Sequence, residues 1–198
     1  MIKAVIFDIG GVTVKDPMEH VYKSVGKKFK INWKRIKKAD EEFDPEIATN
    51  KVSMEKFWTE ISRKLKIEGK RSLEKEWMKA FDVFAVLDEK VVRVIKYAKA
   101  LGYKVAALSN TTNLHERFHR KNGHYRFFDR VFLSNRLHMR KPNAEIYRYA
   151  ARSLKVKPSE CVFIDDKLAN VVGARRAGMK AIWFRKDTPL EKDLKRYL

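Results

Sequence analysis

Several polar residues of this chain follow short apolar runs that are typical of buried β-strands. Asp8 ends the first such run, and later runs are followed by Ser109, Asn110, Asp165 and Asp166. Lys141 comes just before a predicted helix. Because ligands of open parallel sheets bind outside the carboxyl ends of the strands, we expect these side chains to meet at one site.

The three carboxylates of this group predict a site for a divalent cation. At one sheet edge they would repel each other, and a hard cation, best Mg²⁺, would relieve the repulsion with oxygen ligands. A cation beside the Ser109 hydroxyl, backbone amides and the Lys141 ammonium would bind a phosphate group. Asp8 could then attack phosphorus as a nucleophile.

The elements that must position these residues alternate between strand and helix from residue 86 onward. After a first strand that begins near Lys3, strands are expected at 104–108, 130–134, 161–164 and 180–184, with helices at 88–100, 142–154 and 170–177. This alternation predicts an α/β fold with a parallel sheet covered by helices on both faces.

Residues 16–85 show helical periodicity instead and predict a compact helical insertion. Helix starts are expected near Asp16-Pro17, Asn32-Trp33 and Ser53, and Leu73 to Phe81 forms a further apolar face. A break or a new turn is expected at Asp44-Pro45. The chain is therefore divided into a core domain of residues 1–15 and 86–198 and a cap domain of residues 16–85.

The net charge of +20 favours anionic ligands and non-specific attraction to nucleic acid. Most of the excess lies in residues 86–198, and it is interpreted first as a solvated basic surface. The sequence has no apolar stretch long enough for a membrane helix and no recognisable secretory signal. Cys161 is the only cysteine, so a reducing cytoplasm is the expected location. The oligomeric state is left open.

Four motifs, each at the end of an expected element, resemble the haloacid dehalogenase (HAD) superfamily of aspartyl-phosphate phosphohydrolases. They are Phe7-Asp8-Ile9-Gly10-Gly11-Val12, Leu108-Ser109-Asn110-Thr111, Arg140-Lys141-Pro142 and Phe163-Ile164-Asp165-Asp166. The resemblance covers essentially the whole chain and implies a Rossmann-like three-layer core with residues 16–85 as a small helical cap. Within the superfamily, the motifs look similar to the branch that includes alpha-D-glucose-1-phosphate phosphatase.

The resemblance implies a Mg²⁺ site and a nucleophile. Asp8 is implied to be both the nucleophile and a metal ligand. The backbone carbonyl of Gly10 and the carboxylate of Asp166 are implied to bind Mg²⁺ directly, and Asp165 directly or through water.

The resemblance also implies how the phosphoryl group is held. Ser109 and the backbone amide of Asn110 are implied to bind the phosphoryl oxygens. Lys141 is implied to steady the nucleophile and to neutralise charge in the transition state.

Gly10 departs from the pattern of most phosphatases in this superfamily, which have a second Asp as general acid and base at this position. Losing a positioned acid costs a factor of roughly 100 to 10,000 in rate. The departure favours a substrate with a good leaving group, such as an anomeric phosphate, or a proton supplied by water or a cap residue. Dehalogenation is disfavoured, because dehalogenases usually have an aromatic residue followed by Gly-Thr here.

The sequence therefore predicts a Mg²⁺-dependent phosphatase that acts on a small phosphorylated metabolite, with a sugar phosphate favoured. Two alternatives stay open: a phosphatase for nucleotides or nucleic-acid ends, and a catalytically weak nucleic-acid-associated protein on the same scaffold. His20 is a weak candidate for a surrogate acid, and His115 is interpreted first as a structural residue at a helix start. Asn170 is expected either to orient Asp165 or to cap the following helix.

Overall fold

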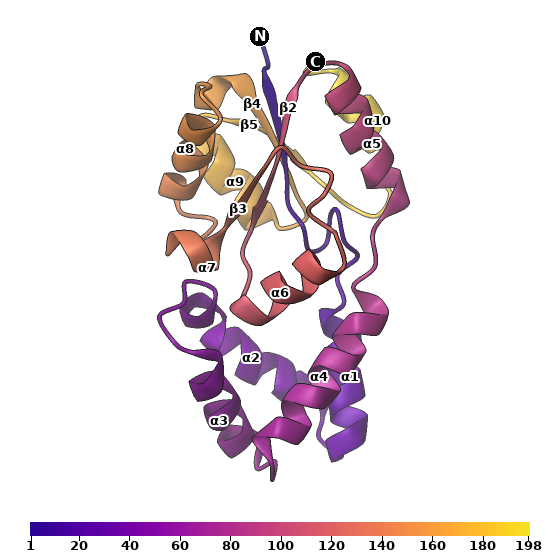
Figure 1. The fold of residues 1–198 in the computed structure, drawn as a ribbon, viewed down its shortest axis with the longest axis vertical. Helices are drawn as coiled ribbons and strands as arrows, with labels where there is room; N and C mark the ends of the chain where they lie inside the picture. The colour runs from indigo at the N-terminus through magenta and orange to yellow at the C-terminus, as the bar shows by residue number, and fades with distance from the viewer.

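The computed structural model describes all 198 residues and contains one five-stranded parallel sheet (Figure 1). The strands are β1 (Ala4–Phe7), β2 (Lys104–Ser109), β3 (Arg130–Leu133), β4 (Cys161–Asp165) and β5 (Lys180–Trp183). Their order is β3-β2-β1-β4-β5, so β1 lies in the centre between β2 and β4. The predicted parallel α/β fold is thus confirmed, and the three strands that carry candidate residues are neighbours.

The strand register brings Asp8 and Asp165 to the same level. Phe7 on β1 pairs with Ile164 on β4 and with Ala107 on β2. Asp8 and Asp165, one residue further along each strand, therefore stand side by side at the carboxyl edge of the sheet.

Helices cover both faces of the sheet and bury alternate residues of each strand. On one face, α8 (Ala144–Ser153) and α9 (Leu168–Arg176) pack against Ala4 and Ile6. On the other face, α5 (Glu89–Ala100) and α10 (Leu190–Lys195) pack on the side of Val5 and Phe7, in a cluster that continues into the cap. The short elements α7 (Ser134–Leu137), η1 (Pro158–Glu160) and α10 were not predicted. No helix combines the length and the apolar character that a membrane span needs.

Residues 18–84 form four helices that lie beyond the carboxyl edge of the sheet (Figure 1). They are α1 (Met18–Phe29), α2 (Trp33–Ile47), α3 (Met54–Leu65) and α4 (Lys70–Phe84). Trp77 is the centre of their packing, because its ring contacts those of Tyr22, Phe57 and Trp58 at centroid distances of 5.6, 6.3 and 5.5 Å. This arrangement agrees with a helical cap, and the exact domain boundaries at 15/16 and 85/86 stay a prediction.

The expected break at Asp44-Pro45 is wrong, because α2 continues through Pro45 to Ile47. Pro45 lies in the last turn of the helix, where the missing N–H removes only one intrahelical hydrogen bond. The Thr49 hydroxyl donates to the Pro45 carbonyl at 2.8 Å and satisfies an acceptor that the end of the helix leaves free.

We predict that Trp77→Ala destabilises the protein more than a typical core substitution, because it empties the centre of the cap. The free energy of unfolding should fall by about 3–5 kcal/mol, measured by urea denaturation followed by circular dichroism. Val83→Ala on the same helix is the control: its side chain is exposed, so the change should stay within about 0.5 kcal/mol. Equal effects of the two substitutions would contradict this packing.

Candidate active site

The ammonium group of Lys141 lies between two carboxylates at the carboxyl edge of the sheet. Its Nζ is 2.8 Å from Oδ1 of Asp8 and 2.7 Å from Oδ2 of Asp165. All three side chains are buried, with Lys141 only 1% exposed. The structure therefore brings together three of the predicted site residues from three separate segments of the chain.

Burial and charge act in opposite directions on these groups. Burial by itself would lower the pKa of Lys141, but the adjacent carboxylates of Asp165 and Asp8 outweigh it, so the pKa lies above its ordinary value. Burial raises the pKa of Asp8 well above its ordinary value, against the opposing effect of Lys141. The Lys141 ammonium therefore stays protonated, but its single positive charge does not fully compensate the negative charge of the carboxylates around it.

The turn after β1 fixes the orientation of Asp8. The backbone N–H of Ile9 donates to Oδ1 of Asp8 at 2.7 Å, and the Thr13 hydroxyl donates to the Asp8 carbonyl at 2.7 Å. Gly11 has φ +82°, in the left-handed region that favours glycine, and a Cβ built there would lie 2.4 Å from Oδ2 of Asp166. Gly11 therefore lets the turn and the Asp166 carboxylate approach each other.

The Asn110 side chain holds the backbone of Lys141 in place. The sequence did not predict this role of the side chain. Its Nδ2 donates to the Lys141 carbonyl at 2.9 Å, and its Oδ1 accepts from the Lys141 N–H at 2.9 Å. Amide side chains commonly make such paired bonds to backbone, but only the fold shows which backbone lies opposite. Ser109, the residue before Asn110, is the last residue of β2 and is buried. The phosphate-binding roles of Ser109 and the Asn110 amide stay predictions.

Asp165 accepts hydrogen bonds on both of its oxygens. Asn170 Nδ2 donates to Oδ1 and Oδ2 at 2.9 and 3.1 Å, and the Lys167 N–H donates to Oδ1 at 2.8 Å. Asn170 makes no cap at the start of α9, so its contacts agree with the interpretation that it orients Asp165.

Asp166 differs from Asp165, because its Oδ1 is buried and accepts no hydrogen bond. Carboxylate oxygens of Asp8, Asp165 and Asp166 lie within 4.8 Å of one another. Burial and the neighbouring Asp165 raise the pKa of Asp166 to about 6. An oxygen-only donor set with uncompensated negative charge and an unpartnered carboxylate oxygen fits a hard divalent cation.

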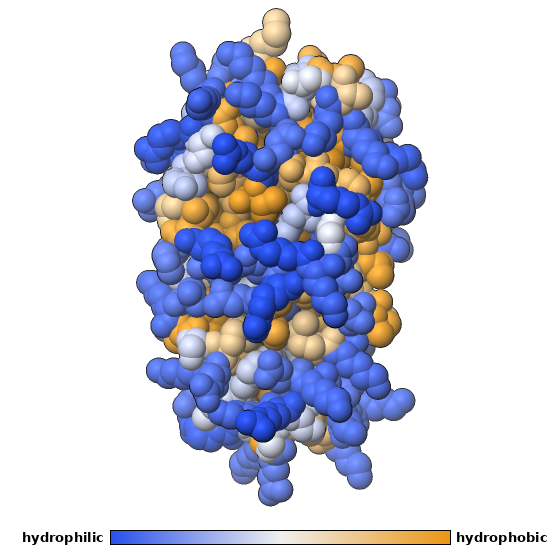
Figure 2. All heavy atoms as spheres, in the orientation of Figure 1, coloured by the Kyte–Doolittle hydropathy of each residue, from blue (hydrophilic) through white to orange (hydrophobic).

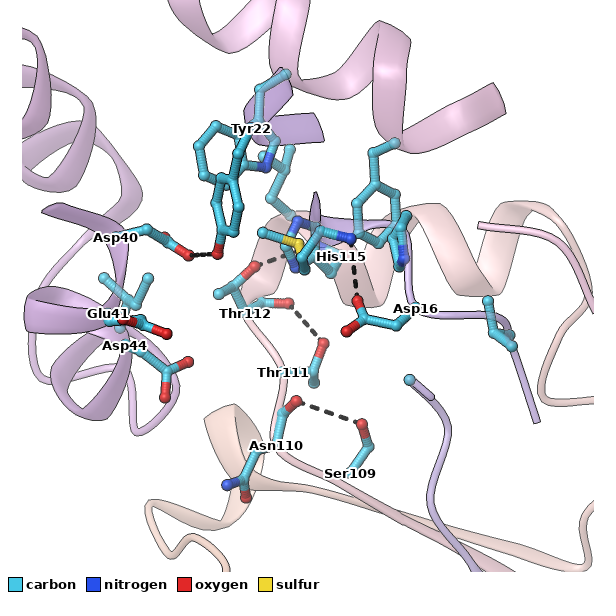
Figure 3. Close-up of a pocket in the computed structure, with 18 of the residues that line it drawn as sticks. Asp16, Tyr22, Asp40, Glu41, Asp44, Ser109, Asn110, Thr111, Thr112 and His115 are labelled. Atoms are coloured by element: carbon cyan, nitrogen blue, oxygen red, sulfur yellow. Dashed lines mark hydrogen bonds between the residues drawn. The ribbon is translucent and has the colours of Figure 1, made fainter. Parts of the chain in front are cut away.

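A cavity of about 420 Å³, lined by Asp8 and Asp166, extends to the cap. Figure 3 shows Ser109 and Asn110 on its core side and Tyr22 and Asp40 on its cap side. Seven carboxylates and three lysines line it, so its wall is acidic although the protein is strongly basic. On the cap side, the Tyr22 hydroxyl donates to Asp40 at 2.6 Å, and burial raises the pKa of Asp40 to about 7. Sequence reasoning missed Asp40, because its run of mixed charges is typical of a solvated helix face.

Two histidines considered from the sequence stack on phenylalanine side chains of α4. The His115 ring stacks on Phe81 at 4.1 Å, and burial lowers the pKa of His115 to about 4. His115 lies at the start of α6 (Asn113–Lys121), where its backbone N–H donates to the Thr112 hydroxyl. Its ring lines the cavity and its buried Nε2 has no hydrogen-bond partner, so the structural role of His115 stays a prediction. His20 stacks on Phe84 at 4.2 Å and does not line the cavity.

The basic residues lie largely outside this cavity. A band of strongly hydrophilic side chains crosses the middle of the face seen in Figure 2, over α6. Helix α6 contributes Arg117, Arg120 and Lys121, all exposed, to this part of the molecule. The excess positive charge is thus on the surface and not at the candidate active site.

Comparison with known proteins identifies a family. The model of the haloacid dehalogenase-like hydrolases matches residues 2–178. The putative phosphatase YhcW of Bacillus subtilis is 27% identical over 191 residues, which are 92% of this chain and 83% of that protein. A glyceraldehyde 3-phosphate phosphatase of Methanopyrus kandleri is 33% identical over 99 residues, 48% of this chain and 42% of that protein. The chain spans less than half the length of several curated relatives that it matches.

Solved structures share the whole fold. A HAD-family enzyme of Bacteroides thetaiotaomicron, BT-2542, superimposes with a TM-score of 0.80 at 21% identity, covering 98% of each chain. The same enzyme has been crystallised with magnesium and inorganic phosphate. At this identity the likeness concerns the fold, and it confirms the Rossmann-like HAD architecture inferred from the motifs.

We predict that Gly11→Ala disrupts the site and that Gly10→Ala does not. A Cβ at Gly11 would collide with the Asp166 carboxylate in a strained backbone conformation, whereas a Cβ at Gly10 meets nothing within 4 Å. Gly11→Ala should lower the thermal midpoint and weaken Mg²⁺ binding measured by calorimetry. Gly10→Ala should leave both unchanged, and equal effects of the two changes would contradict the geometry.

We predict that Lys141→Met destabilises the protein in a pH-dependent way. Removing one partner of a buried ion pair costs about 3–5 kcal/mol at neutral pH. Without the ammonium, the folded-state pKa of Asp8, which burial already raises, lies still further above its unfolded value. The native state then binds more protons than the unfolded state. The loss of folding stability caused by Lys141→Met therefore grows from about pH 4 toward neutrality.

Urea denaturation at pH 4.5 and 7.5, with the exposed Lys121→Met as control, tests this pH dependence. The difference between Lys141→Met and the wild-type protein should shrink at the lower pH. A loss that is the same at both pH values would contradict the proposed carboxylate–ammonium coupling.

Proposed function

The chain belongs to the haloacid dehalogenase-like hydrolases, and we propose that this member is a phosphatase that transfers a phosphoryl group to Asp8 and then to water. The substrate is a small phosphorylated metabolite, with a sugar phosphate favoured, and Mg²⁺ is the cofactor. The observation that carries the proposal is the Lys141 ammonium, which lies between Asp8 and Asp165 at the floor of the cavity.

The similar proteins support phosphate-ester hydrolysis. Glyceraldehyde 3-phosphate phosphatases and the putative phosphatase YhcW are among the relatives, and BT-2542 binds magnesium and inorganic phosphate. The glucose-1-phosphate phosphatase branch rests on the sequence motifs alone. A cytoplasmic location is part of the proposal and rests on the single cysteine.

In the first step Asp8 attacks phosphorus. Its Oδ1 is held by the Ile9 N–H and by Lys141, which leaves Oδ2 without a hydrogen bond from the protein. The new bond forms between Oδ2 and phosphorus while the bond from phosphorus to the leaving oxygen breaks. Lys141 favours the ionised form of Asp8 against the effect of burial and offsets the charge that develops on the phosphoryl oxygens. Ser109 and the Asn110 amide are proposed to donate to those oxygens.

In the second step a water oxygen attacks phosphorus and the bond to Asp8 breaks. The products are inorganic phosphate and the restored Asp8 carboxylate, and the water loses a proton to solvent or to a group in the cavity. The cap over the cavity limits the water around the acyl phosphate, so hydrolysis depends on a water admitted beside phosphorus.

The residues present fit a divalent cation. Asp8, Asp165, Asp166 and the Gly10 carbonyl would hold it, with Asp165 acting through water because Lys141 and Asn170 occupy its oxygens. When bound, Mg²⁺ offsets the negative charge shared by these carboxylates and the phosphate.

Gly10 offers the leaving group no acid, so the leaving oxygen must take its proton from water or depart as a stable anion. This supports an anomeric phosphate or another ester with a good leaving group. The space beside Gly10 is open, since a Cβ there meets no atom within 4 Å.

The cavity supports a small substrate over nucleic acid. The four cap helices lie over the site (Figure 1), and the cavity wall carries seven carboxylates against three lysines. A cavity of about 420 Å³ under the cap has room for a small phosphorylated molecule, whereas a nucleic-acid strand would have to displace the cap helices to reach Asp8.

The proposal is tested by a phosphate-release screen over sugar phosphates, nucleotides and acyl phosphates, with and without Mg²⁺. Release should require Mg²⁺ and be lost in Asp8→Asn, which removes the nucleophile. Silence of the wild-type protein across the panel, or undiminished activity of Asp8→Asn, would overturn the proposal.

We predict that Gly10→Asp raises the hydrolysis of alkyl phosphates with poor leaving groups by about ten-fold or more, because a positioned acid contributes roughly 100- to 10,000-fold when well placed. Hydrolysis of anomeric phosphates should change much less. Gly10→Ala is the matched control for the added Cβ. If Gly10→Asp leaves alkyl phosphate hydrolysis at the level of Gly10→Ala, the account of this position is wrong.

A further inference from the structure

Three polar contacts join the cap to the core on one side of the cavity. Arg140 Nη2 donates to Asp44 Oδ2 at 2.6 Å, His138 Nδ1 lies 2.9 Å from the Thr49 carbonyl oxygen, and Asn113 Nδ2 donates to Asn50 Oδ1 at 3.0 Å. The cap residues come from the end of α2 and the loop after it, which lies next to α7 in Figure 1. We call these three contacts the cap latch.

The covalent connections between cap and core lie in other segments, at residues 13–16 and 85–88. They are held to each other by hydrogen bonds from Lys15 N–H to the Val86 carbonyl and from Asp88 N–H to the Thr13 carbonyl, both at 2.9 Å. Neither connection includes a latch residue. The cap is thus joined to the core at a backbone hinge, by the packing of Phe81 on α4 against His115 and Phe118 on α6, and, in separate segments, by the latch contacts.

Arg140 makes the one ion pair of the latch, and it comes from a firmly held loop. The next residue is Lys141, whose backbone N–H and carbonyl are both bonded to the Asn110 side chain. The Arg140 side chain is 24% exposed, and its partner Asp44 also lines the cavity. The cap is therefore anchored at its rim to the same loop that supplies the buried ammonium at the floor.

We propose that Arg140 is a positioning residue that holds the cap closed over the cavity through Asp44. The pair is partly solvated, so it can break and re-form as a substrate enters and a product leaves. Because the latch already favours the closed cap, the substrate does not have to supply the free energy of closure when it binds. Its apparent affinity is therefore higher. The kinetic part of this inference rests on the proposed function, and the conformational part does not.

Tryptophan fluorescence provides a readout that is independent of activity. Three of the four tryptophans, Trp33, Trp58 and Trp77, line the cavity, and Trp183 lies outside it. Opening the cap should increase acrylamide access to Trp33 and Trp58, while Trp77, packed inside the cap, and Trp183 contribute the same background in every variant. Arg140→Gln should raise the acrylamide quenching constant, and Arg140→Lys should restore it, because only one nitrogen of Arg140 contacts Asp44.

Salt and a second ion pair supply the controls. High salt should raise the quenching of the wild-type protein toward that of Arg140→Gln and leave the variant unchanged, because salt screens a partly exposed pair. Arg63→Gln removes an ion pair to Glu60 within α3 and should have no effect on quenching. Unchanged quenching in Arg140→Gln, with a normal thermal midpoint, would overturn the proposal.

Steady-state kinetics on a substrate found in the phosphate-release screen test the functional part. Arg140→Gln should raise KM by about two- to ten-fold, as expected for one partly exposed ion pair, while kcat changes by less. A fall in kcat with unchanged KM would show that Arg140 acts in the chemical step instead of in cap closure. If no variant has activity, the proposed phosphatase function fails, and the quenching measurements still decide whether the latch exists.

Discussion

The buried ion triad of Lys141, Asp8 and Asp165 is the interaction on which the rest of the site depends. Taking such charges out of water costs several kcal/mol per ion, so the triad is stable only when its geometry is fixed and its remaining bonds are satisfied. The surrounding structure meets this need: Asn110 holds the Lys141 backbone and Asn170 holds the Asp165 carboxylate. The parallel register then places both aspartates at the ends of neighbouring strands.

The same triad leaves part of the negative charge at the site uncompensated. Asp166 has a buried oxygen without a partner, and the pKa values of Asp8 and Asp166 are both raised by burial. A divalent cation would offset this excess of negative charge and could then hold a phosphate group beside the carboxylates. The basic surface is separate from it, and the +20 net charge therefore bears on encounters with anions more than on chemistry in the cavity.

The sheet and the site could be predicted because their signals are local. An apolar run followed by a carboxylate marks both the strand and the residue at its end, as at Asp8 and Asp165. The bonds of Asn110 to Lys141 could not be predicted, since they join segments 31 residues apart and only folding places them opposite each other. The same holds for the contact of Asp44 with Arg140. The course of α2 through Pro45 was missed because the residue before a proline is biased away from helical geometry, and only the fold shows that the helix continues two residues beyond Pro45.

We infer that the triad prepares Asp8 to receive a phosphoryl group. The most direct measurement is a crystal structure of the protein with Mg²⁺ and beryllium trifluoride, which mimics a phosphoryl group on a carboxylate. We predict beryllium bonded to Asp8 Oδ2, with Lys141 still in contact with Oδ1 and the cation among Asp8, Asp165 and Asp166. Beryllium trifluoride bound elsewhere, with Asp8 unmodified at saturating concentration, would contradict the claim.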